Sequence, residues 1–223
     1  MVSTPPRVAV YTAICGGYND LLPVPTIPGV DCIAYVEGAA PHHRDGWEVR
    51  PAWASARHPR RAAKLYKLFP HLVLPTHDAT IWIDGTVALH VPEFVDLALQ
   101  TAEPSGLGLW RHPERGCIYQ EAVVSVTMDK YADEPIMDQA GHYQDQGHPV
   151  DAGLWACGIL ARWHRPEVET LCGMWADEVD RWSVQDQLAF PVACRRLGFV
   201  PDELPAALYD NPWLTVTGHN PAF

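Results

Sequence analysis

Residues 79–86 of the chain read Ala-Thr-Ile-Trp-Ile-Asp-Gly-Thr, and this stretch contributes most to the prediction of the fold. Its apolar and β-branched residues predict a short buried strand that ends abruptly at Asp84 and Gly85. A carboxylate at the end of such a strand faces the crevice in which open α/β sheets bind ligands. The glycine lets a phosphate or a metal approach the backbone closely. The alternative interpretation is an ordinary turn, which Asp-Gly pairs often close.

Strand and helix patterns alternate along most of the chain. Apolar runs predict strands at 7–14, 32–36, 107–110 and 155–162. Helical spacing predicts helices at 60–74, 92–100, 166–182 and 184–197, and at least two helical pieces within 119–147. This alternation predicts the α/β class, with a central, mostly parallel sheet flanked by helices. We expect one domain over residues 1–223, with its core at about 7–200 and a proline-punctuated arm at 201–223.

The predicted helix that begins at residue 60 carries an unusual group of cations. Arg60, Arg61, Lys64 and Lys67 lie within eight residues of a chain whose net charge is −11. Arg60, Lys64 and Lys67 have the spacing i, i+4 and i+7, so their charged ends share one face of the helix and can converge on a diphosphate. The alternative is a solvated helix face.

Two further carboxylates are candidates for acid–base chemistry. Ser183 is a predicted N-cap, which would put Asp186 at the third helical position as a capping-box acid. Asp186 could instead act as a base or an anchor beside the acceptor. Glu121 lies among apolar and aromatic residues, and its alternative is an exposed helix acid.

Several partners and locations are disfavoured by the sequence. The net charge of −11 argues against duplex nucleic acid, whose phosphates would be repelled. No apolar run reaches the length of a membrane helix, and no secretory signal is visible, so we expect a cytoplasmic protein. The eleven histidines show no metal-site spacing, although His219 could fold back over the site. The oligomeric state stays open.

Five stretches of the chain resemble a known family, the glycosyltransferase-like domain of unknown function 616. Its members occur in bacterial polysaccharide loci and in plant Golgi proteins. The similar stretches span nearly the whole of residues 7–197, and the block from Lys64 to Asp84 is the most specific part. They are YTAICGGYND at 11–20, RAAKLYKLFPH at 61–71, IWIDGT at 81–86, HPERGCIYQE at 112–121 and WSVQDQ at 182–187.

The resemblance implies a GT-A-like fold in which a nucleotide sugar lies over the carboxyl edge of the sheet. Asp84 falls where such enzymes begin an Asp-x-Asp motif that holds a metal, but the third position here is Thr86. We expect Mn²⁺ or Mg²⁺ at Asp84, Thr86 and His219. A metal-free site, with Lys64 and Lys67 neutralising the diphosphate, is the alternative. The expected donor site comprises Thr12, Tyr18, Arg60, Arg61, Lys64, Lys67, Asp84 and Gly85.

These observations predict a nucleotide-sugar-dependent glycosyltransferase. Such an enzyme would move a sugar to the hydroxyl of a glycan or a small-molecule acceptor. An inverting reaction needs a carboxylate base near that hydroxyl, for which Asp186 is the first candidate and Glu121 the second. Two alternatives remain: an amide hydrolase of the ceramidase-like type suggested for some plant relatives, and a non-catalytic nucleotide-sugar binder. The donor base, the sugar, the acceptor and the stereochemistry are not specified by the sequence.

Overall fold

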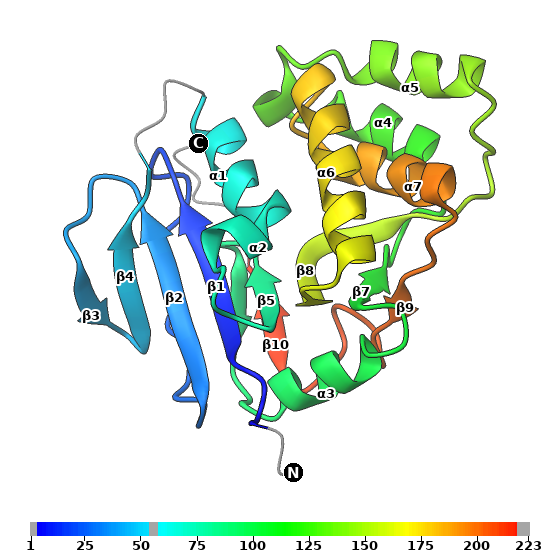
Figure 1. The fold of residues 1–223 in the computed structure, drawn as a ribbon. Coiled ribbons are helices and arrows are strands. Elements are labelled where there is room, and N and C mark those ends of the chain that lie inside the picture. The colour runs from blue at the N-terminus through cyan, green and yellow to red at the C-terminus, as the bar shows by residue number, and fades with distance from the viewer. Residues whose placement is uncertain (1–3, 54–57, 218–223) are drawn as a thin grey trace.

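A mixed eight-stranded sheet forms the centre of the molecule (Figure 1). The computed structural model describes residues 4–53 and 58–217. The strand order is β3-β4-β2-β1-β5-β8-β7-β9. Six of the eight strands are parallel to one another, and β3 and β8 run in the opposite direction. The strands are β1 (Val8–Ile14), β2 (Val30–Val36), β3 (His42–Arg44), β4 (Trp47–Pro51), β5 (Ala79–Ile83), β7 (Leu107–Arg111), β8 (Trp155–Trp163) and β9 (Asp202–Glu203).

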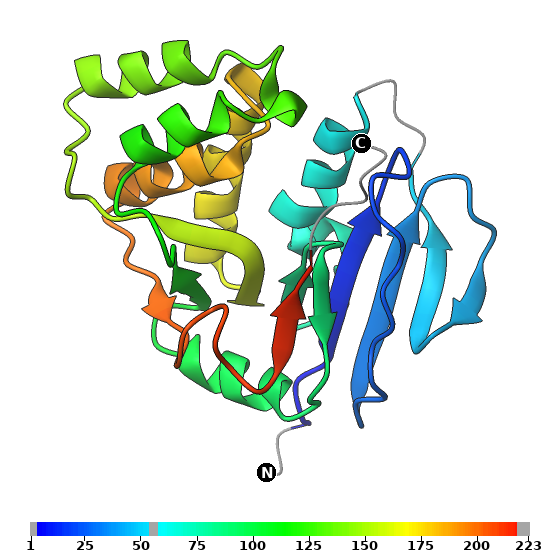
Figure 2. The ribbon, with the colours of Figure 1, turned by 180° about the vertical axis from the view of Figure 1, so that it is seen from behind.

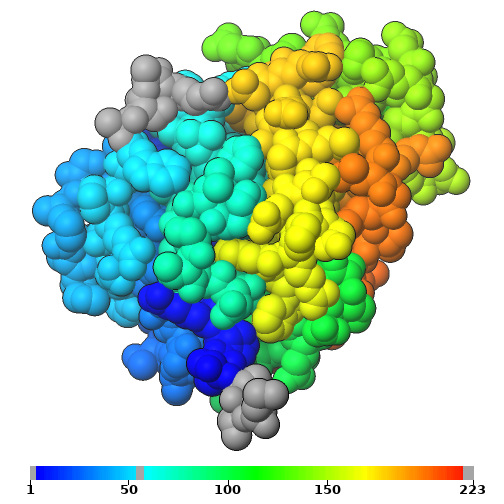
Figure 3. All heavy atoms as spheres, viewed as in Figure 1, coloured from blue at the N-terminus to red at the C-terminus, as the bar shows by residue number. Residues whose placement is uncertain are grey.

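Helices flank both faces of this sheet, which confirms the predicted α/β class. Helices α1, α2, α6 and α7 cover one face, and Figure 3 shows α1 and α6 side by side on it. The other face is covered by α3 and by a two-stranded ribbon of β6 and β10, seen from behind in Figure 2. The remaining elements are α1 (Pro59–Leu68), α2 (Pro70–Val73), β6 (Val87–Leu89), α3 (Phe94–Thr101), α4 (Ile118–Ser125), the 3₁₀ turn η1 (Asp129–Tyr131), α5 (Ile136–Asp145), α6 (Pro166–Arg181), α7 (Asp186–Leu197) and β10 (Leu214–Val216).

The central strand β1 is buried along its whole length. Val8 and Val10 pack into the cluster beneath α3, whereas Ala9 and Tyr11 pack into the cluster beneath α1 and α6. This alternation follows from the two-residue period of a strand. A strand buried on both faces reads as a continuous apolar run, which is why residues 7–14 could be predicted.

A buried arginine ties helix α1 to the sheet. Arg162 of β8 is fully buried and donates to the backbone carbonyl of Lys67 at 2.6 Å and to the hydroxyl of Tyr11 at 2.6 Å. The Tyr11 hydroxyl in turn donates to the carbonyl of Tyr66 at 3.0 Å. These donors satisfy carbonyls in the last turn of α1, where a cation also complements the helix dipole. These hydrogen bonds therefore fix the position of Lys67 above the sheet.

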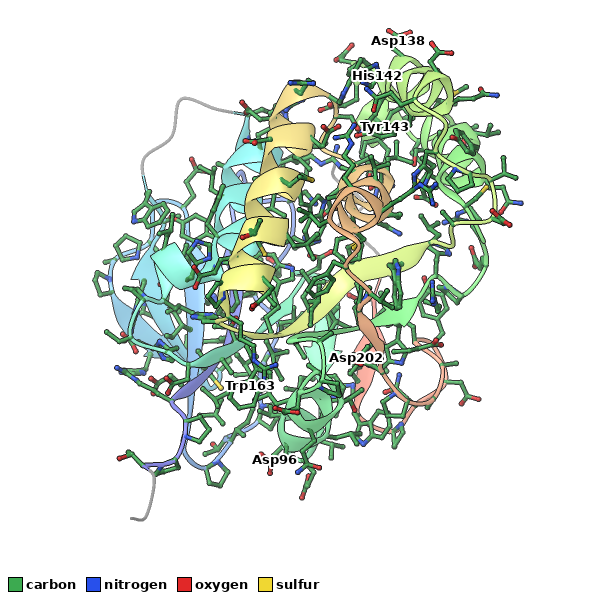
Figure 4. All side chains as sticks on the ribbon, turned by 45° about the vertical axis from the view of Figure 1, so that its right-hand side comes forward. Asp96, Asp138, His142, Tyr143, Trp163 and Asp202 are labelled. Carbon is green, nitrogen blue, oxygen red and sulfur yellow. The ribbon has the colours of Figure 1, made fainter. Side chains whose placement is uncertain are left out.

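A third apolar cluster joins α4, α5 and α7 beyond the β7 side of the sheet. Tyr143 of α5, labelled in Figure 4, donates to Glu178 Oε2 of α6 at 2.8 Å and links this cluster to the main layer. The neighbouring His142 packs its ring against Trp182, with 4.9 Å between centroids. Within the ranges that the structure describes, no helix is both long and apolar enough to cross a membrane.

The structure corrects several predicted elements. The helix expected at 60–74 is two helices, because Pro70 cannot continue the hydrogen bonding of α1 and instead begins α2. Leu72, within the expected helix, is 63% exposed. The C-terminal segment expected as an arm is part of the fold as far as residue 217: β9 pairs parallel with β7, and β10 pairs antiparallel with β6. The short strands β3, β4 and β6 were not predicted.

Candidate active site

A cleft of about 340 Å³ lies at the carboxyl ends of β1 and β5, within the size range of small-molecule sites. An irregularity in the sheet lies beside it. Strand β8 pairs with β7 through Ala161 and again through Ala156, but the register shifts between these pairs. Gly158, in the shifted part of β8, lines the cleft where β5 ends. The side chains of α1, η1 and the start of α7 complete its walls.

Asp84 lies at the end of β5 and faces this cleft. Its backbone N–H donates to the Gly158 carbonyl at 2.8 Å. Its Oδ1 accepts the indole N–H of Trp82 at 2.6 Å and lies 3.2 Å from Lys67 Nζ. The Asp84 side chain is 39% exposed. A Cβ on Gly158 would contact Asp84 Oδ2 at 3.4 Å, so the glycine keeps the space beside this second oxygen open.

Asp186 joins both lysines of α1. Its Oδ2 lies 2.7 Å from Lys64 Nζ and 2.6 Å from Lys67 Nζ, and the residue is 3% exposed. Burial alone would raise the pKa of Asp186, but the two ammonium groups outweigh burial and lower it to about 2. A carboxylate with so low a pKa is a poor proton acceptor at neutral pH. The geometry therefore disagrees with the predicted role of Asp186 as a base.

The structure contradicts the capping geometry expected for Asp186. Helix α7 begins at Asp186, with Gln185 as its N-cap. Ser183, the expected cap, instead donates its hydroxyl to Gln139 Oε1 at 2.5 Å. The carboxylate of Asp186 thus lies at the first helical position and points at the lysines, where the helix N-terminus favours negative charge.

Lys67 is the most buried of the charged residues that line the cleft, with its side chain 2% exposed. Burial opposes its charge, but the carboxylates of Asp186 and Asp84 outweigh burial and raise its pKa. Lys64 is nearer the opening, with its side chain 19% exposed. Burial lowers the pKa of Lys64, and the Lys67 charge adds to this, although Asp186 opposes both. Lys67 therefore binds the two carboxylates together, and Lys64 presents charge to the cleft.

Two further cations lie at the cleft. The Arg60 guanidinium stacks 4.5 Å from the ring centroid of Tyr131 and donates to the carbonyl of Lys130. Lys130 itself lines the cleft, with Nζ 5.1 Å from the same ring. The chain contains only three lysines, Lys64, Lys67 and Lys130, and all of them line this cleft. Sequence analysis missed Lys130, although the scarcity of lysine was a usable signal.

Glu121 lies behind the cleft wall. It is 2% exposed, so the alternative of an exposed helix acid is wrong. Its carboxylate accepts hydrogen bonds from Arg115 Nε and, at 2.6 Å, from Gln185 Nε2. Glu121 does not contribute to the described cleft lining, which disagrees with its predicted role as the second base.

His112 was not considered as a site residue, yet it lines the cleft. Its Nδ1 accepts the backbone N–H of Arg115 at 3.1 Å, and its Nε2 lies 2.9 Å from the Arg115 guanidinium. Burial and the Arg115 charge lower the pKa of His112, so the ring is neutral at pH 7. Nδ1 accepts a backbone N–H, and Nε2 lies beside the positive charge of Arg115, so His112 is part of the wall rather than a base.

The structure divides the predicted donor residues into two groups. Most of them line the cleft, as does Thr86, and these are Tyr18, Arg60, Lys64, Lys67, Asp84 and Gly85. Thr12 does not, because its side chain is buried within β1 at 2% exposure. Arg61 lies about 100° around the helix from Arg60 and donates to the carbonyls of Val179 at 2.9 Å and Trp182 at 3.0 Å. These two contacts tie α1 to α6.

The expected metal site is only partly described. Asp84 and Thr86 line the cleft, whereas His219 falls outside the described residues. Within residues 4–53 and 58–217, no three His, Cys, Asp or Glu side chains are grouped as a metal site. Lys67 Nζ lies between the carboxylates of Asp84 and Asp186, the position that a bridging cation would need. These residues therefore do not fit the expected divalent metal, which stays a prediction.

The chain is similar to a family model and to a plant protein. A family model described as "TOD1/MUCI70, glycosyltransferase-like domain" matches residues 54–209. The Arabidopsis thaliana protein "Probable hexosyltransferase MUCI70" is 26% identical over 140 residues, covering 59% of this chain and 24% of that protein. The chain thus matches about a quarter of the length of this relative. The family description supports the expected glycosyltransferase-like family but does not carry the number 616, which stays a prediction.

Two glycosyltransferases are among the solved structures that are similar to this chain. The apo structure of the bifunctional glycosyltransferase WbbM has a TM-score of 0.43 at 12% identity, covering 84% of this chain and 37% of that one. The apo form of mouse xyloside xylosyltransferase 1 has a TM-score of 0.44 at 10% identity, covering 85% of this chain and 81% of that one.

Proposed function

Because the chain belongs to the TOD1/MUCI70 glycosyltransferase-like family, we propose that it transfers a sugar from a nucleotide-diphosphate donor to the hydroxyl of an acceptor. One observation carries the proposal. All three lysines of an acidic chain, together with Arg60, line the cleft into which Asp84 projects at the end of β5. Cations gathered at the carboxyl edge of an α/β sheet suit a phosphorylated ligand. The position also suits the expected GT-A-like arrangement, with the nucleotide over this edge.

The cations divide the cleft into two parts. The donor diphosphate would lie against Lys64, Arg60 and Lys130, which face the opening. The sugar would lie beside Asp84, whose partly exposed carboxylate can accept hydrogen bonds from sugar hydroxyls. In the transfer, the acceptor oxygen bonds to the anomeric carbon, and the bond from that carbon to the diphosphate breaks with its electron pair on the phosphate oxygen. The acceptor proton passes to the departing diphosphate or to a carboxylate.

The protein's contribution to this step is electrostatic. Negative charge develops on the departing phosphate oxygen, and Lys64 is already oriented there by Asp186 at 2.7 Å. A donor group that is fixed before the reaction stabilises the transition state without reorganising. The backbone carbonyl of Lys67 accepts a hydrogen bond from Arg162. The Lys67 ammonium group adds positive charge on the same side of the cleft.

The acceptor side is suggested by two aromatic residues. Tyr18 follows β1, and Tyr209 lies between β9 and β10; both line the cleft. Tyr209 is 62% exposed, so its ring is accessible to a ligand that enters the cleft. The flat faces of such rings suit the apolar faces of sugar units. We propose that the acceptor, a glycan or a glycosylated small molecule, enters across Tyr209.

A non-catalytic binder is the second candidate, and one observation favours it. The two carboxylates predicted as bases, Asp186 and Glu121, are both held by cations. The amide hydrolase has less support, because the thiol of Cys15, which lines the cleft, is not a nucleophile. Burial and the Glu37 charge raise the pKa of Cys15 to about 11, so Cys15 stays protonated at neutral pH.

The experiment is a calorimetric and thermal-shift screen of uridine, guanosine, adenosine and cytidine diphosphates, followed by turnover assays with the matching nucleotide sugars. A ligand at about 100 times its dissociation constant adds roughly 2.7 kcal/mol of stability, or about 5–11 °C in Tm for a chain of this size. Arg44→Ala, which removes an exposed cation on β3, is the control. Binding with transfer to an acceptor supports the transferase. Binding without turnover across a broad acceptor panel favours the binder, and no binding contradicts both.

A further inference from the structure

The charges that line the cleft balance a nucleotide diphosphate without help from a metal. Among the described lining residues, four side chains are positive (Arg60, Lys64, Lys67 and Lys130) and two are negative (Asp84 and Asp186). The net charge of the lining is therefore two positive charges. The two phosphates of a nucleotide-diphosphate sugar carry about one negative charge each. The cleft and the ligand thus neutralise each other directly.

The carboxylates that would bind a divalent cation are already engaged. Asp186 Oδ2 contacts the ammonium groups of both Lys64 and Lys67. Asp84 Oδ1 accepts the Trp82 indole N–H and lies 3.2 Å from Lys67. A cation bridging Asp84 and Asp186 would have to displace Lys67, which is 1% exposed and is held by Arg162 through its carbonyl. A divalent cation entering a cleft that is already positive would also be repelled.

From this arrangement we infer that the cleft binds the diphosphate of its donor independently of a divalent cation. Lys67 takes the place of the metal between Asp84 and Asp186, and Lys64 contacts the diphosphate. The inference rests on the proposed function and specifies how that site neutralises its ligand. It also reverses the expected role of Asp84. A metal-binding aspartate helps to hold the diphosphate, whereas a metal-free Asp84 places a negative charge near it.

The test measures the affinity of the full chain for the four nucleoside diphosphates by calorimetry, once with a chelator and once with Mn²⁺. We expect at least one of them to bind with dissociation constants that agree within about threefold between the two conditions. Lys64→Ala should weaken this binding at least about tenfold, whereas the matched control Arg44→Ala should leave it unchanged. Affinity that falls more than about tenfold in chelator overturns the inference but leaves the proposed function standing.

Asp84→Asn gives the second arm. In chelator, removing this negative charge should leave the dissociation constant unchanged or lower it, because the ligand is also negative. Binding by this variant that is about tenfold weaker than that of the wild type in Mn²⁺ but not in chelator, with unchanged Tm, would show that Asp84 holds a metal and would overturn the inference. The absence of nucleoside-diphosphate binding under both conditions would contradict the proposed function itself.

Discussion

Substituting Asp186 by asparagine separates an electrostatic anchor from a catalytic base. The amide would keep the shape of the side chain but leave Lys64 and Lys67 without the carboxylate that lies 2.7 and 2.6 Å from them. The difference between the ordinary pKa of 3.8 and about 2 in the fold corresponds to about 2 kcal/mol of stabilisation. Removing one partner of a buried ion pair typically costs about 3–5 kcal/mol. We therefore expect a loss of about 3 kcal/mol at pH 7.

Such a loss should lower Tm by about 6–12 °C in a chain of this size. Differential scanning calorimetry measures the loss, and Asp177→Asn, an exposed carboxylate on α6, is the matched control. The pH dependence gives a further check. Because the pKa of Asp186 is lowered in the fold, its contribution is fully present above the unfolded value of about 3.9. It is lost as the pH falls towards about 2, so the gap between wild type and variant should narrow below about pH 4.

The opposite result would refute this reasoning. If Asp186 acts as a base, the variant should keep its Tm within about 1–2 °C and lose turnover by roughly 10²–10⁴-fold with donor binding intact. A Tm that is unchanged at pH 7 would show that the ion pairs contribute little. Asp186 would then again be the first candidate for the catalytic base, as the sequence predicted.

Three other substitutions test other parts of the site. Asp84→Asn should lower turnover at least about 100-fold with Tm within about 2 °C, because its carboxylate is the partly exposed one beside the sugar; normal turnover in a steady-state assay would reduce Asp84 to a turn residue. Arg162→Met should destabilise the fold by about 3–5 kcal/mol in urea unfolding, because it leaves the Lys67 carbonyl without its buried donor; a stable variant would mean that α1 is positioned by packing alone. Tyr209→Ala should raise KM for the acceptor about tenfold and leave KM for the donor unchanged, and equal effects on both would place Tyr209 outside the acceptor path.

The parts of the fold that could be predicted are those with a local signal. Strands β1, β5 and β8 are apolar runs because they are buried on both faces of the sheet. Strand β9 has only two residues, Asp202 and Glu203, and β10 is mostly exposed. These short strands exist because distant partners, β7 and β6, offer hydrogen bonds to them. A stretch of two or three residues contains no sequence pattern that indicates such a pairing partner.

The site shows the same division between local and distant causes. The end of β5 at Asp84 and the spacing of the cations on α1 were visible, because each lies within one element. The contact of Lys67 with Asp186 joins residues on different helices, and it reverses two expectations. Lys67 was expected on a polar face but is buried because two carboxylates compensate its charge. Asp186 was expected as a base but is held by the same lysine. Only the folded arrangement shows these changes.

The placement of the three lysines also allows the cleft to be modified selectively by reagents that react with lysine. Every side-chain amine of the protein lines one site, so an acylating reagent modifies either the cleft or no lysine at all. Lys130 is the most accessible of the three lysines, whereas Lys64 and Lys67 are enclosed by their ion pairs with Asp186. Partial burial and the charges of Arg60 and Lys64 lower the pKa of Lys130, which favours its reactive, uncharged form. Fluorophores or surface-coupling chemistry directed at lysine side chains would therefore attach at the mouth of the cleft, and a sample immobilised in this way would have its ligand site turned towards the support.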